Sequence, residues 1–223
     1  MPAYPGFDSD VFPGPATLAW LKANTNLVWC GYYLAPAPNH HDRSWMGQRA
    51  ALTAAGWGLA PTYLGQQLSL SGSHIMTAAQ GTIDGDEAAA FMRSEGFAQG
   101  SFVYLDLEDG PPFAGSRTDY VAAWVAAVEA AQFGAGVYCS HAFAAEVQAT
   151  QPNIRVWAYR VPIDTVHPFP GTNFPDSAPA GCGYTGAFMW QLGQNCQITL
   201  GVTPPGQLVV DLSTSVSPDP SHP

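Results

Sequence analysis

Two acidic residues, Asp106 and Glu108, follow an apolar stretch that begins at Phe102, and their type and spacing could support acid–base chemistry. Successive side chains of a strand point to opposite faces, so the two carboxylates would share one face with Cα atoms roughly 6.6 Å apart. Strands that are apolar on both faces are typical of parallel sheets covered by helices, where chemistry takes place at the carboxyl ends. The alternative is a pair of solvated acids at a strand exit, with residues 109–112 as the turn.

Further acids follow other predicted strands. Asp8 and Asp10 come at the end of the first strand, and Asp211 lies in the last one. In a closed barrel the first and last strands are neighbours, and the strand of Asp106 lies across from them. Carboxylates gathered in a partly dry pocket repel one another, so at least one should keep its proton near neutral pH. A protonated acid beside an ionised one is the pair that cleaves glycosidic bonds.

Aromatic side chains occur late in the same predicted strands and fit a sugar substrate. Rings there could stack on sugar faces, while the amide of Gln191 could bind hydroxyl groups. Taken singly, each ring would more often pack in the core or at the rim, so their shared position is the signal. The aromatic residues are Tyr33, Tyr63, Tyr138, Trp157, Tyr159 and Trp190.

The order of predicted elements indicates an α/β fold. Helices are expected only after the first five strands, and Ser44 is expected to cap the second helix. Eight strands connected in this way favour a (β/α)8 TIM-type barrel with parallel strands and with the last helices missing or reduced. The strands are expected over residues 4–8, 26–34, 58–64, 102–108, 136–139, 154–159, 187–192 and 207–212, and the helices over residues 16–24, 44–55, 84–95, 120–132 and 142–149.

The chain of 223 residues is long enough for one barrel domain, expected over residues 1–216, with residues 217–223 as a disordered tail. Residues 162–185 are expected to form a long irregular connection, and loops of that length are usually functional. The net charge of −10, with few basic residues, argues against binding to nucleic acid or to anionic membranes. The sequence has no apolar run long enough for a membrane span. It also lacks the pattern of a signal peptide, which leaves the cytosol, another export route or a removed export segment open.

Other kinds of site are weaker hypotheses. The sequence His40-His41-Asp42 could supply metal ligands, but adjacent side chains point different ways and no His-x-x-x-His or Cys-x-x-Cys spacing occurs. We therefore expect no metal. The absence of a Gly-x-Ser-x-Gly elbow argues against Ser-His-Asp chemistry. A dinucleotide cofactor is also not expected, so we expect no cofactor. Cys182 and Cys196 flank one strand and could form a disulfide.

Several motifs resemble those of the glycoside hydrolase family 25 lysozymes. The sequence Gly6-Phe7-Asp8-Ser9 looks like their first-strand signature Gly-Ile-Asp-Val-Ser, and Leu105-Asp106-Leu107-Glu108 is similar to their fourth-strand Asp-x-Glu. Segments 136–140, 156–158, 189–191 and 210–212 follow in that family's order. A closer resemblance is to the glycoside-hydrolase-like domain of unknown function 1906, of the type found in mycobacterial exported proteins. Its Gly-Phe-Asp, Phe-Pro-Gly-Pro, Trp-Cys-Gly-Tyr-Tyr-Leu and Tyr-Leu-Asp-Leu-Glu-Asp segments match this chain.

The resemblance implies roles for individual residues. Glu108 would be the general acid that protonates the leaving oxygen, and Asp106 would stabilise positive charge or orient a substrate acetamido group. Asp8 and Asp211 would tune this pair and bind the sugar. Asp10 is an extra acid that departs from the family's motif, and we expect it to bind substrate. An extracellular or cell-envelope location is also implied.

The expected partner is a glycan, either peptidoglycan or another N-acetylated amino-sugar polymer, bound by a monomer. Two functions therefore stand: a lysozyme-like glycoside hydrolase, and a barrel that binds glycans or cell wall without cutting them.

Overall fold

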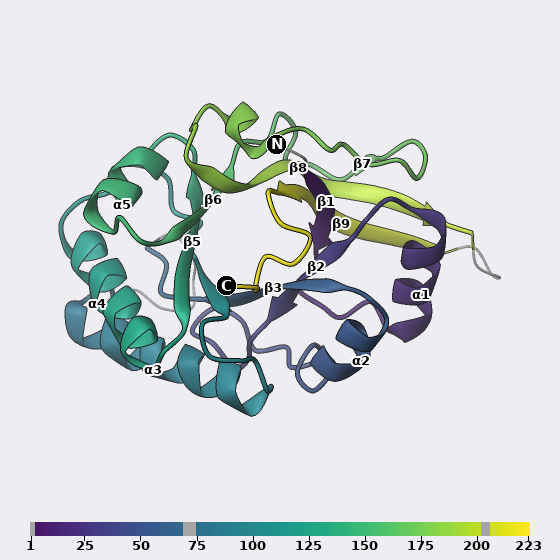
Figure 1. Ribbon diagram of the computed structural model, residues 1–223. Helices are drawn as coiled ribbons and strands as arrows, with labels where there is room; N and C mark the ends of the chain where they lie inside the picture. Colours follow the sequence, from purple (N-terminus) through teal and green to yellow (C-terminus); the bar gives the residue numbers. More distant parts are fainter. Residues whose placement is uncertain (1–2, 69–74, 202–205) are drawn as a thin grey trace.

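The computed structural model describes residues 3–68, 75–201 and 206–223, and eight of its strands form a closed barrel (Figure 1). The strand order is β6-β5-β4-β3-β2-β1-β9-β8, and pairing of β6 with β8 closes the ring. This confirms the predicted TIM-type barrel. In chain order the elements are β1 (Tyr4–Asp8), α1 (Pro15–Asn24), β2 (Trp29–Tyr33), α2 (Arg49–Ala54), β3 (Gly58–Leu64), α3 (Ala78–Ser94), β4 (Phe102–Asp106), α4 (Ser116–Ala130), β5 (Gly134–Ser140), α5 (Ala144–Thr150), β6 (Arg155–Tyr159), β7 (His167–Pro168), the 3-10 helix η1 (Pro179–Cys182), β8 (Ala187–Leu200) and β9 (Gly206–Ser215).

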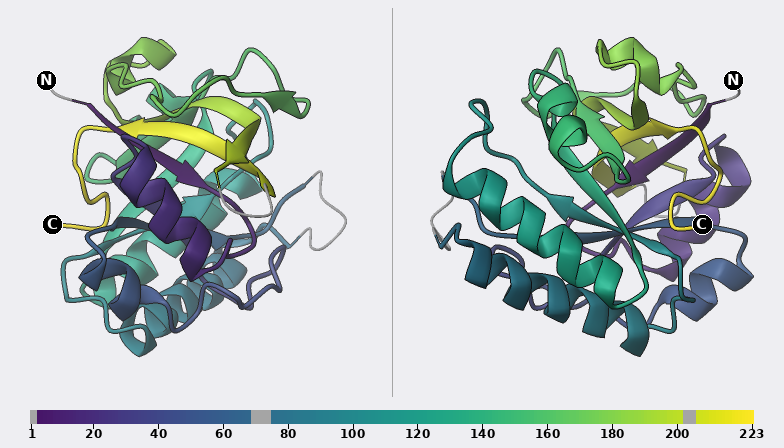
Figure 2. Two further views of the ribbon diagram at one scale, coloured as in Figure 1. Left: turned by 90° about the vertical axis from the view of Figure 1, so that its right-hand side faces the viewer. Right: turned by 60° about the vertical axis from the view of Figure 1, so that its left-hand side comes forward.

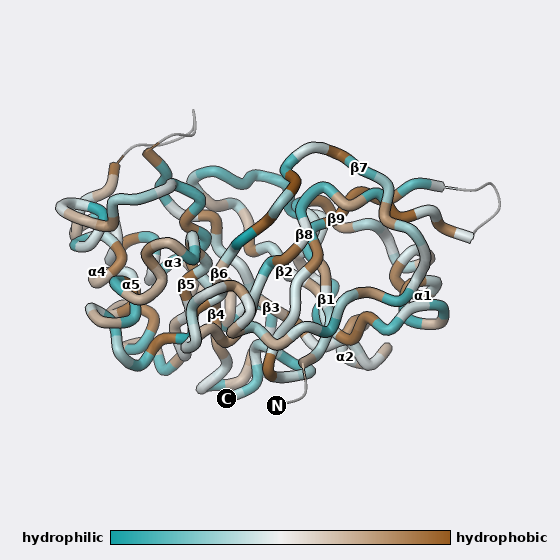
Figure 3. Tube along the Cα trace, turned by 90° about the horizontal axis from the view of Figure 1, so that it is seen from above, coloured by the Kyte–Doolittle hydropathy of each residue, from teal (hydrophilic) through white to brown (hydrophobic). Residues whose placement is uncertain are grey.

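Helices cover the barrel on the side of β1–β6, whereas the described residues that follow β8 and β9 form no α-helix (Figures 1 and 2). The helix traces alternate between hydrophilic and hydrophobic residues, as expected for helices with one face on the barrel and one in solvent (Figure 3). Within the described residues, no helix has the length and apolar character needed to cross a bilayer.

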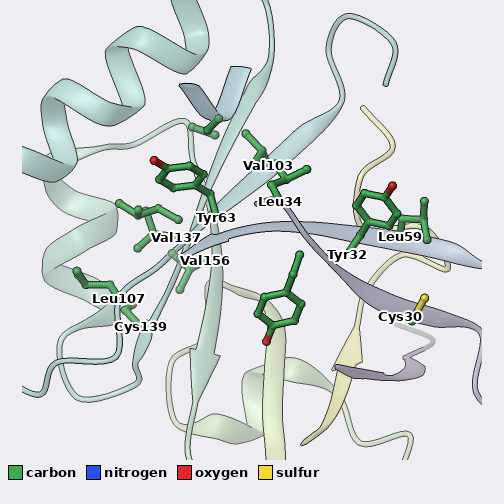
Figure 4. Packing of buried hydrophobic residues seen from close by; sticks show 14 of the residues in the cluster. Cys30, Tyr32, Leu34, Leu59, Tyr63, Val103, Leu107, Val137, Cys139 and Val156 are labelled. Carbon is green, nitrogen blue, oxygen red and sulfur yellow. The ribbon is translucent and has the colours of Figure 1, made fainter. Parts of the chain in front are cut away.

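The alternation of side chains along the strands produces two cores. The outward-pointing residues of β4, Val103 and Leu105, pack in the larger core between strands and helices. Figure 4 shows Val103 within this core. Tyr104, which lies between them, points inward and packs with Trp29 and Trp157 in a separate core that fills the barrel. Because Asp106 has the same parity as Tyr104, it points inward at the carboxyl end of this filling.

Gly6 makes room for the inner core. A Cβ atom at this position would lie 2.2 Å from the ring of Trp29, which is fully buried and donates its indole N–H to the carbonyl of Tyr4 at 2.9 Å. The glycine of the Gly6-Phe7-Asp8 segment therefore lets an indole fill the barrel directly below Asp8. The acid is held at the top of a packed interior.

The last strand runs against the others, which corrects the expectation of parallel strands throughout. Strands β1–β6 pair in parallel and β8 is parallel to β6, but β9 is antiparallel to both β8 and β1. Only residues 201–205 separate β8 from β9, and a parallel crossover needs a dozen residues or more. The two strands are also longer than predicted.

Residues 217–223, expected to be a disordered tail, instead pack across the amino-terminal end of the barrel (Figure 1). We call them the closing segment. The backbone N–H of Phe102 donates to the carbonyl of Ser221 at 2.8 Å, and Tyr104 donates to the carbonyl of Pro220 at 2.9 Å. The segment is held because strand ends and the interior Tyr104 offer donors that its carbonyl groups accept.

The second helix is shorter than predicted, and Ser44 does not cap it. Helix α2 begins at Arg49, and Gln48, at its N-cap, makes no side-chain cap hydrogen bond. Ser44 instead accepts a hydrogen bond from the backbone of Phe12 at 2.9 Å. The following residue, Trp45, is fully buried and donates to the carbonyl of Ser9 at 2.9 Å, which holds this part of the chain in turns.

All four cysteines lie in described parts of the chain, and each is buried and free. Cys182, on η1, has its sulfur 3.3 Å from the backbone nitrogen of Tyr184, while Cys196, on β8, lies 3.7 Å from a ring nitrogen of His167. The disulfide that the sequence allowed between them is not present.

Candidate functional site

Four carboxylates from distant parts of the chain line one hollow at the carboxyl end of β4. Asp8 ends β1 and Asp106 ends β4, while Glu108 lies two residues beyond β4 and Asp211 lies within β9. Asp8 and Asp211 are register partners on adjacent antiparallel strands, so their side chains point to the same face. An outer cavity of about 300 Å³ lined by Asp8, Glu108 and Asp211 lies next to a small inner pocket of about 40 Å³ that all four acids line.

Asp8 is buried with only half of its hydrogen-bonding capacity used. Its side chain is 6% exposed, and one carboxylate oxygen accepts a hydrogen bond from the hydroxyl of Tyr33 at 3.0 Å. The other oxygen, Oδ2, is buried and has no partner among the described residues. Burial raises the pKa of Asp8 well above its ordinary value, and the charge of Asp211 raises it further, against the opposing effect of the Tyr33 hydrogen bond.

Asp106 is also buried. It is 5% exposed, and its Oδ1 atom is buried without a partner in the described part of the chain. Burial raises the pKa of Asp106 well above the ordinary range, and the charges of Glu108 and Asp8 add to the effect. Two buried acids with raised pKa values can hold protons at a pH where exposed aspartates are ionised.

Glu108 is the acid that reaches solvent. Its side chain is exposed, and burial of part of it, followed by the charges of Asp211 and Asp109, raises its pKa. The carbonyl of Glu108 accepts a hydrogen bond from the hydroxyl of Tyr159 at 3.0 Å, which ties the end of β4 to β6. Glu108 therefore combines a tendency to keep its proton with access to a ligand in the hollow.

Gln67, which the sequence did not single out, fixes the segment that carries both acids. Its side chain is fully buried, its amide nitrogen donates to the carbonyl of Asp106 at 2.7 Å, and its amide oxygen accepts from the backbone N–H of Glu108 at 3.0 Å. One side chain thus spans the turn between the acids. Its place directly after the third strand, at the same end of the barrel as the acids, was the available signal.

Asp211 is held by donors on β8. The amide of Gln191 donates to Oδ2 at 2.7 Å, and the backbone N–H of Asn195 donates to Oδ1 at 2.7 Å. Asn195 has φ of 55°, a left-handed conformation that asparagine tolerates, within an irregular stretch of the β8–β9 pairing. Burial still raises the pKa of Asp211, although both hydrogen bonds act to lower it.

The remaining predicted residues divide by the direction in which they point. Tyr138 donates to the amide oxygen of Gln191, and Trp157 is buried in the barrel interior, where its indole N–H donates to Ser213 at 3.2 Å. Both line the inner pocket, and the exposed Asp10 lines the outer cavity.

Tyr63 and Trp190 were predicted to bind substrate, but the structure places both outside the hollow. Tyr63 points toward the helices and donates to Glu87 on α3 at 2.6 Å (Figure 4). Trp190 lines a separate surface cleft and donates to the carbonyl of Arg160 at 3.2 Å. Thr62 and Gln191, their neighbours along the strands, line the pocket because side chains alternate.

Within the described residues, no cluster of three His, Cys, Asp or Glu side chains is placed to hold a metal ion. His40 is buried and its ring lies 5.1 Å from that of Tyr33, behind the residue that contacts Asp8. The hollow is lined by carboxyl groups that compete for few protons, and tyrosine and amide groups donate hydrogen bonds to them. This arrangement can donate a proton to a leaving group and stabilise positive charge.

A sequence match with a known protein family covers more than half of the chain. Residues 19–178 match the sequence model of the Rv2525c-like, glycoside hydrolase-like domain. Asp106 and Glu108 lie within the matched residues, and Asp8 and Asp211 lie outside them. No curated protein sequence gives a significant match.

Three solved structures with the same fold bear on the site. The Tat-secreted protein Rv2525c of Mycobacterium tuberculosis, in complex with L-tartrate, is 14% identical, with a TM-score of 0.63 over 98% of this chain and 97% of that one. The bacterial lysozyme of Streptomyces coelicolor is 12% identical, with a TM-score of 0.57 over 96% and 92%. The modular autolysin LytC of Streptococcus pneumoniae, in complex with a synthetic peptidoglycan ligand, is 8% identical, with a TM-score of 0.60 over 95% and 46%. At these identities the likeness establishes the fold.

Proposed function

Because the chain belongs to the Rv2525c-like, glycoside hydrolase-like domain family, we propose that it hydrolyses glycosidic bonds in cell-wall or other amino-sugar glycans by carboxylate acid–base catalysis. The observation that carries the proposal is the convergence of Asp8, Asp106, Glu108 and Asp211 on one hollow, with raised pKa values. The lysozyme and the peptidoglycan-bound autolysin that share the fold support a glycan as the substrate class.

In this mechanism Glu108 is the general acid. Its raised pKa keeps a proton available, and its exposure lets that proton reach the oxygen of the leaving sugar. Gln67 fixes the backbone between Asp106 and Glu108 through its two hydrogen bonds. Asp106 stabilises the positive charge that develops on the sugar ring or orients a substrate acetamido group. Asp8 and Asp211 lie close enough to raise the pKa of Asp106 and so tune the pair. Asp10 and Tyr33 line the outer cavity, where they would contact the sugar.

The small size of the inner pocket favours a second candidate function. Its volume of about 40 Å³ is close to that of one water molecule, so a sugar ring cannot enter it. Asp8 and Asp106 would then contact the ligand only at its edge, as acids that bind hydroxyl groups without cutting. This is a carbohydrate-binding barrel.

The substitution Glu108→Gln separates the two functions. It keeps the size of the side chain and removes the acidic proton, so cleavage should fall by about 10²–10⁴-fold while glycan binding remains. The measurement is the release of reducing ends from peptidoglycan, chitin oligosaccharides and their de-N-acetylated forms, with binding measured in parallel. Glu129→Gln, at an exposed position on α4, is the matched control. Binding by the unsubstituted protein with no turnover of any glycan in this panel would reject the hydrolase and leave the binding barrel.

A further inference from the structure

The lining of the hollow carries an unusual balance of charge. Five acids, Asp8, Asp10, Asp106, Glu108 and Asp211, line its two parts. Among the described lining residues there is no lysine, arginine or histidine. The carboxylates must therefore be neutralised by protons or by a cation that arrives with the ligand.

Most hydrogen-bond donors of the hollow already have partners within the protein. The hydroxyl of Tyr33 donates to the carboxylate of Asp8, and the hydroxyl of Tyr138 donates to the amide oxygen of Gln191. The amide nitrogen of Gln191 donates to the carboxylate of Asp211. The backbone N–H of Asn195 also donates a hydrogen bond to the carboxylate of Asp211. Among the described lining side chains, the amide of Gln194 donates no hydrogen bond, and the amides of Gln191 and Asn195 each donate one. A ligand that carries hydrogen-bond donors is therefore complementary to the carboxylate acceptors of the hollow.

Two of these acceptors are buried and aimed at the inner pocket. Asp8 Oδ2 and Asp106 Oδ1 are shielded from solvent and lack partners within the described residues, although both side chains are more than nine-tenths buried. A ligand group that completes the site must be small, must carry several N–H or O–H donors, and is favoured if it is positively charged.

We propose that the hollow selects a glucosamine-type residue whose 2-amino group is free and protonated, in preference to the N-acetylated residue. This inference rests on the proposed function, in that it takes the ligand to be an amino-sugar glycan. A primary ammonium brings three N–H donors and a positive charge, and it can replace protons that the carboxylates would otherwise share. An acetamido group brings one N–H, an apolar methyl group and a carbonyl oxygen that needs a donor of its own.

The preference also bears on the role of Asp106. A free amine has no acetamido carbonyl oxygen to attack the sugar carbon, so Asp106 would act by stabilising positive charge. Hydroxyl groups are shared by the two kinds of sugar, so a difference in binding reports on the substituent at carbon 2 alone.

The test is calorimetric titration of the protein with the tetramers of glucosamine and of N-acetylglucosamine, with tetralysine as a polycation that carries no sugar. We expect the glucosamine tetramer to bind about tenfold more tightly than the N-acetylated one, and the difference to shrink in high salt. Asp8→Asn and Asp106→Asn should each reduce the preference to about twofold. Asp86→Asn, which removes an exposed charge from α3, should leave it unchanged. The salt dependence uses the unsubstituted protein, so the test holds even if an Asn variant fails to fold.

Equal or tighter binding of the N-acetylated tetramer would overturn the inference, and so would tetralysine binding as tightly as the glucosamine tetramer. Neither result touches the proposed function, which is lost only if no glycan of the cleavage panel is cut. Cleavage with the preference reversed would thus remove this inference alone.

Discussion

The aspartates at the two ends of the barrel have opposite hydrogen-bonding environments. At the amino-terminal end, Asp219 of the closing segment accepts hydrogen bonds on Oδ1 from the backbone N–H groups of Leu59 and Ser221, at 3.1 and 3.0 Å, and from the Ser221 hydroxyl at 2.8 Å. At the carboxyl end, Asp8 Oδ2 and Asp106 Oδ1 have no such donors among the described residues. The aspartate at the amino-terminal end thus has hydrogen-bond donors for its carboxylate oxygen, whereas the two aspartates at the carboxyl end each have a carboxylate oxygen without one in the described part of the chain.

The charges differ in the same way. Near the closing segment, Arg155 donates to the carbonyls of Pro220 and His222 at 3.0 and 2.7 Å, and its guanidinium lies 3.5 Å from the ring centre of Phe102. The hollow, in contrast, is lined by acidic residues, and its described lining includes no lysine, arginine or histidine. Buried polar atoms without partners cost free energy and persist mainly where a ligand or a reaction uses them. The contrast therefore assigns stability to one end of the barrel and chemistry to the other, and each prediction below tests that division.

Deleting the closing segment should have the largest effect. Removal of residues 217–223 takes away the partners of Phe102, Tyr104 and Arg155 and should lower the free energy of unfolding by about 3–5 kcal/mol, measured in urea. Glycan binding per folded molecule should not change. Gly58→Ala offers a milder test, because a Cβ at this position would lie 2.0 Å from the carbonyl oxygen of Pro218. A deletion variant as stable as the full chain would contradict the assignment of stability to this end.

Substitution of one aspartate at each end should change stability in opposite directions. Asp219→Ala should lower the free energy of unfolding by about 2–3 kcal/mol because it removes three hydrogen bonds. Asp106→Asn should raise it by about 1–2 kcal/mol at neutral pH, because it removes a carboxylate that is costly to ionise where it lies.

The pH dependence provides the control for this pair. The pKa of Asp106 is raised in the folded state, so the folded protein binds that proton more tightly than the unfolded chain. Its contribution to stability is complete below the ordinary carboxyl pKa and is lost as the pH rises through the raised value. Asp106→Asn should therefore gain most relative to the unsubstituted protein at neutral pH and nothing in strong acid. A gain that does not vary with pH would point to packing instead of charge.

Gln67→Leu should weaken function more than its effect on stability would suggest. The leucine cannot bond to Asp106 and Glu108, so the segment between the acids loosens and the rate of cleavage should fall by about tenfold, mainly in kcat. Gln148→Leu is the matched control, since Gln148 also holds backbone carbonyls by its amide but lies within α5 and away from the hollow. It should lower the melting temperature and leave kcat unchanged. Equal loss of kcat in both variants would mean that Gln67 acts only through stability.

The sequence predicted much of the fold because strand alternation and helix spacing are local signals. It located Asp8, Asp106 and Asp211 at one end of a barrel, and the structure brings them together. The antiparallel course of β9 and the docking of residues 217–223 depend on contacts with distant strands, which local patterns do not encode.

The errors in the site have a simpler cause. Trp190 and Gln191 are adjacent in a strand, so both could not face the hollow. Tyr63 pairs with the outward-pointing Leu105, and this register between β3 and β4 places it on the helix side. The position of Gln67 after β3 indicates only that it lies at the end of the barrel where the acids lie, because its hydrogen bonds depend on the path of the loop after β3.

Two single variants, Tyr33→Phe and Tyr63→Phe, should give the smallest effects. Their comparison tests whether the direction in which a tyrosine side chain points decides if it belongs to the site. Tyr33→Phe removes the hydrogen bond that acts to lower the pKa of Asp8, so that pKa should rise further. If Asp8 must be ionised for cleavage, the acidic limb of the pH–rate profile should move to higher pH, with a fall in rate of about two- to fivefold at neutral pH. Tyr63→Phe removes a hydrogen bond to Glu87 on the helix side and should cost about 1 kcal/mol of stability with no change in the profile. Identical profiles for the two variants would mean that Tyr33 takes no part in setting the protonation of Asp8, and that the outward and inward faces of the strands do not differ in function as the hollow requires.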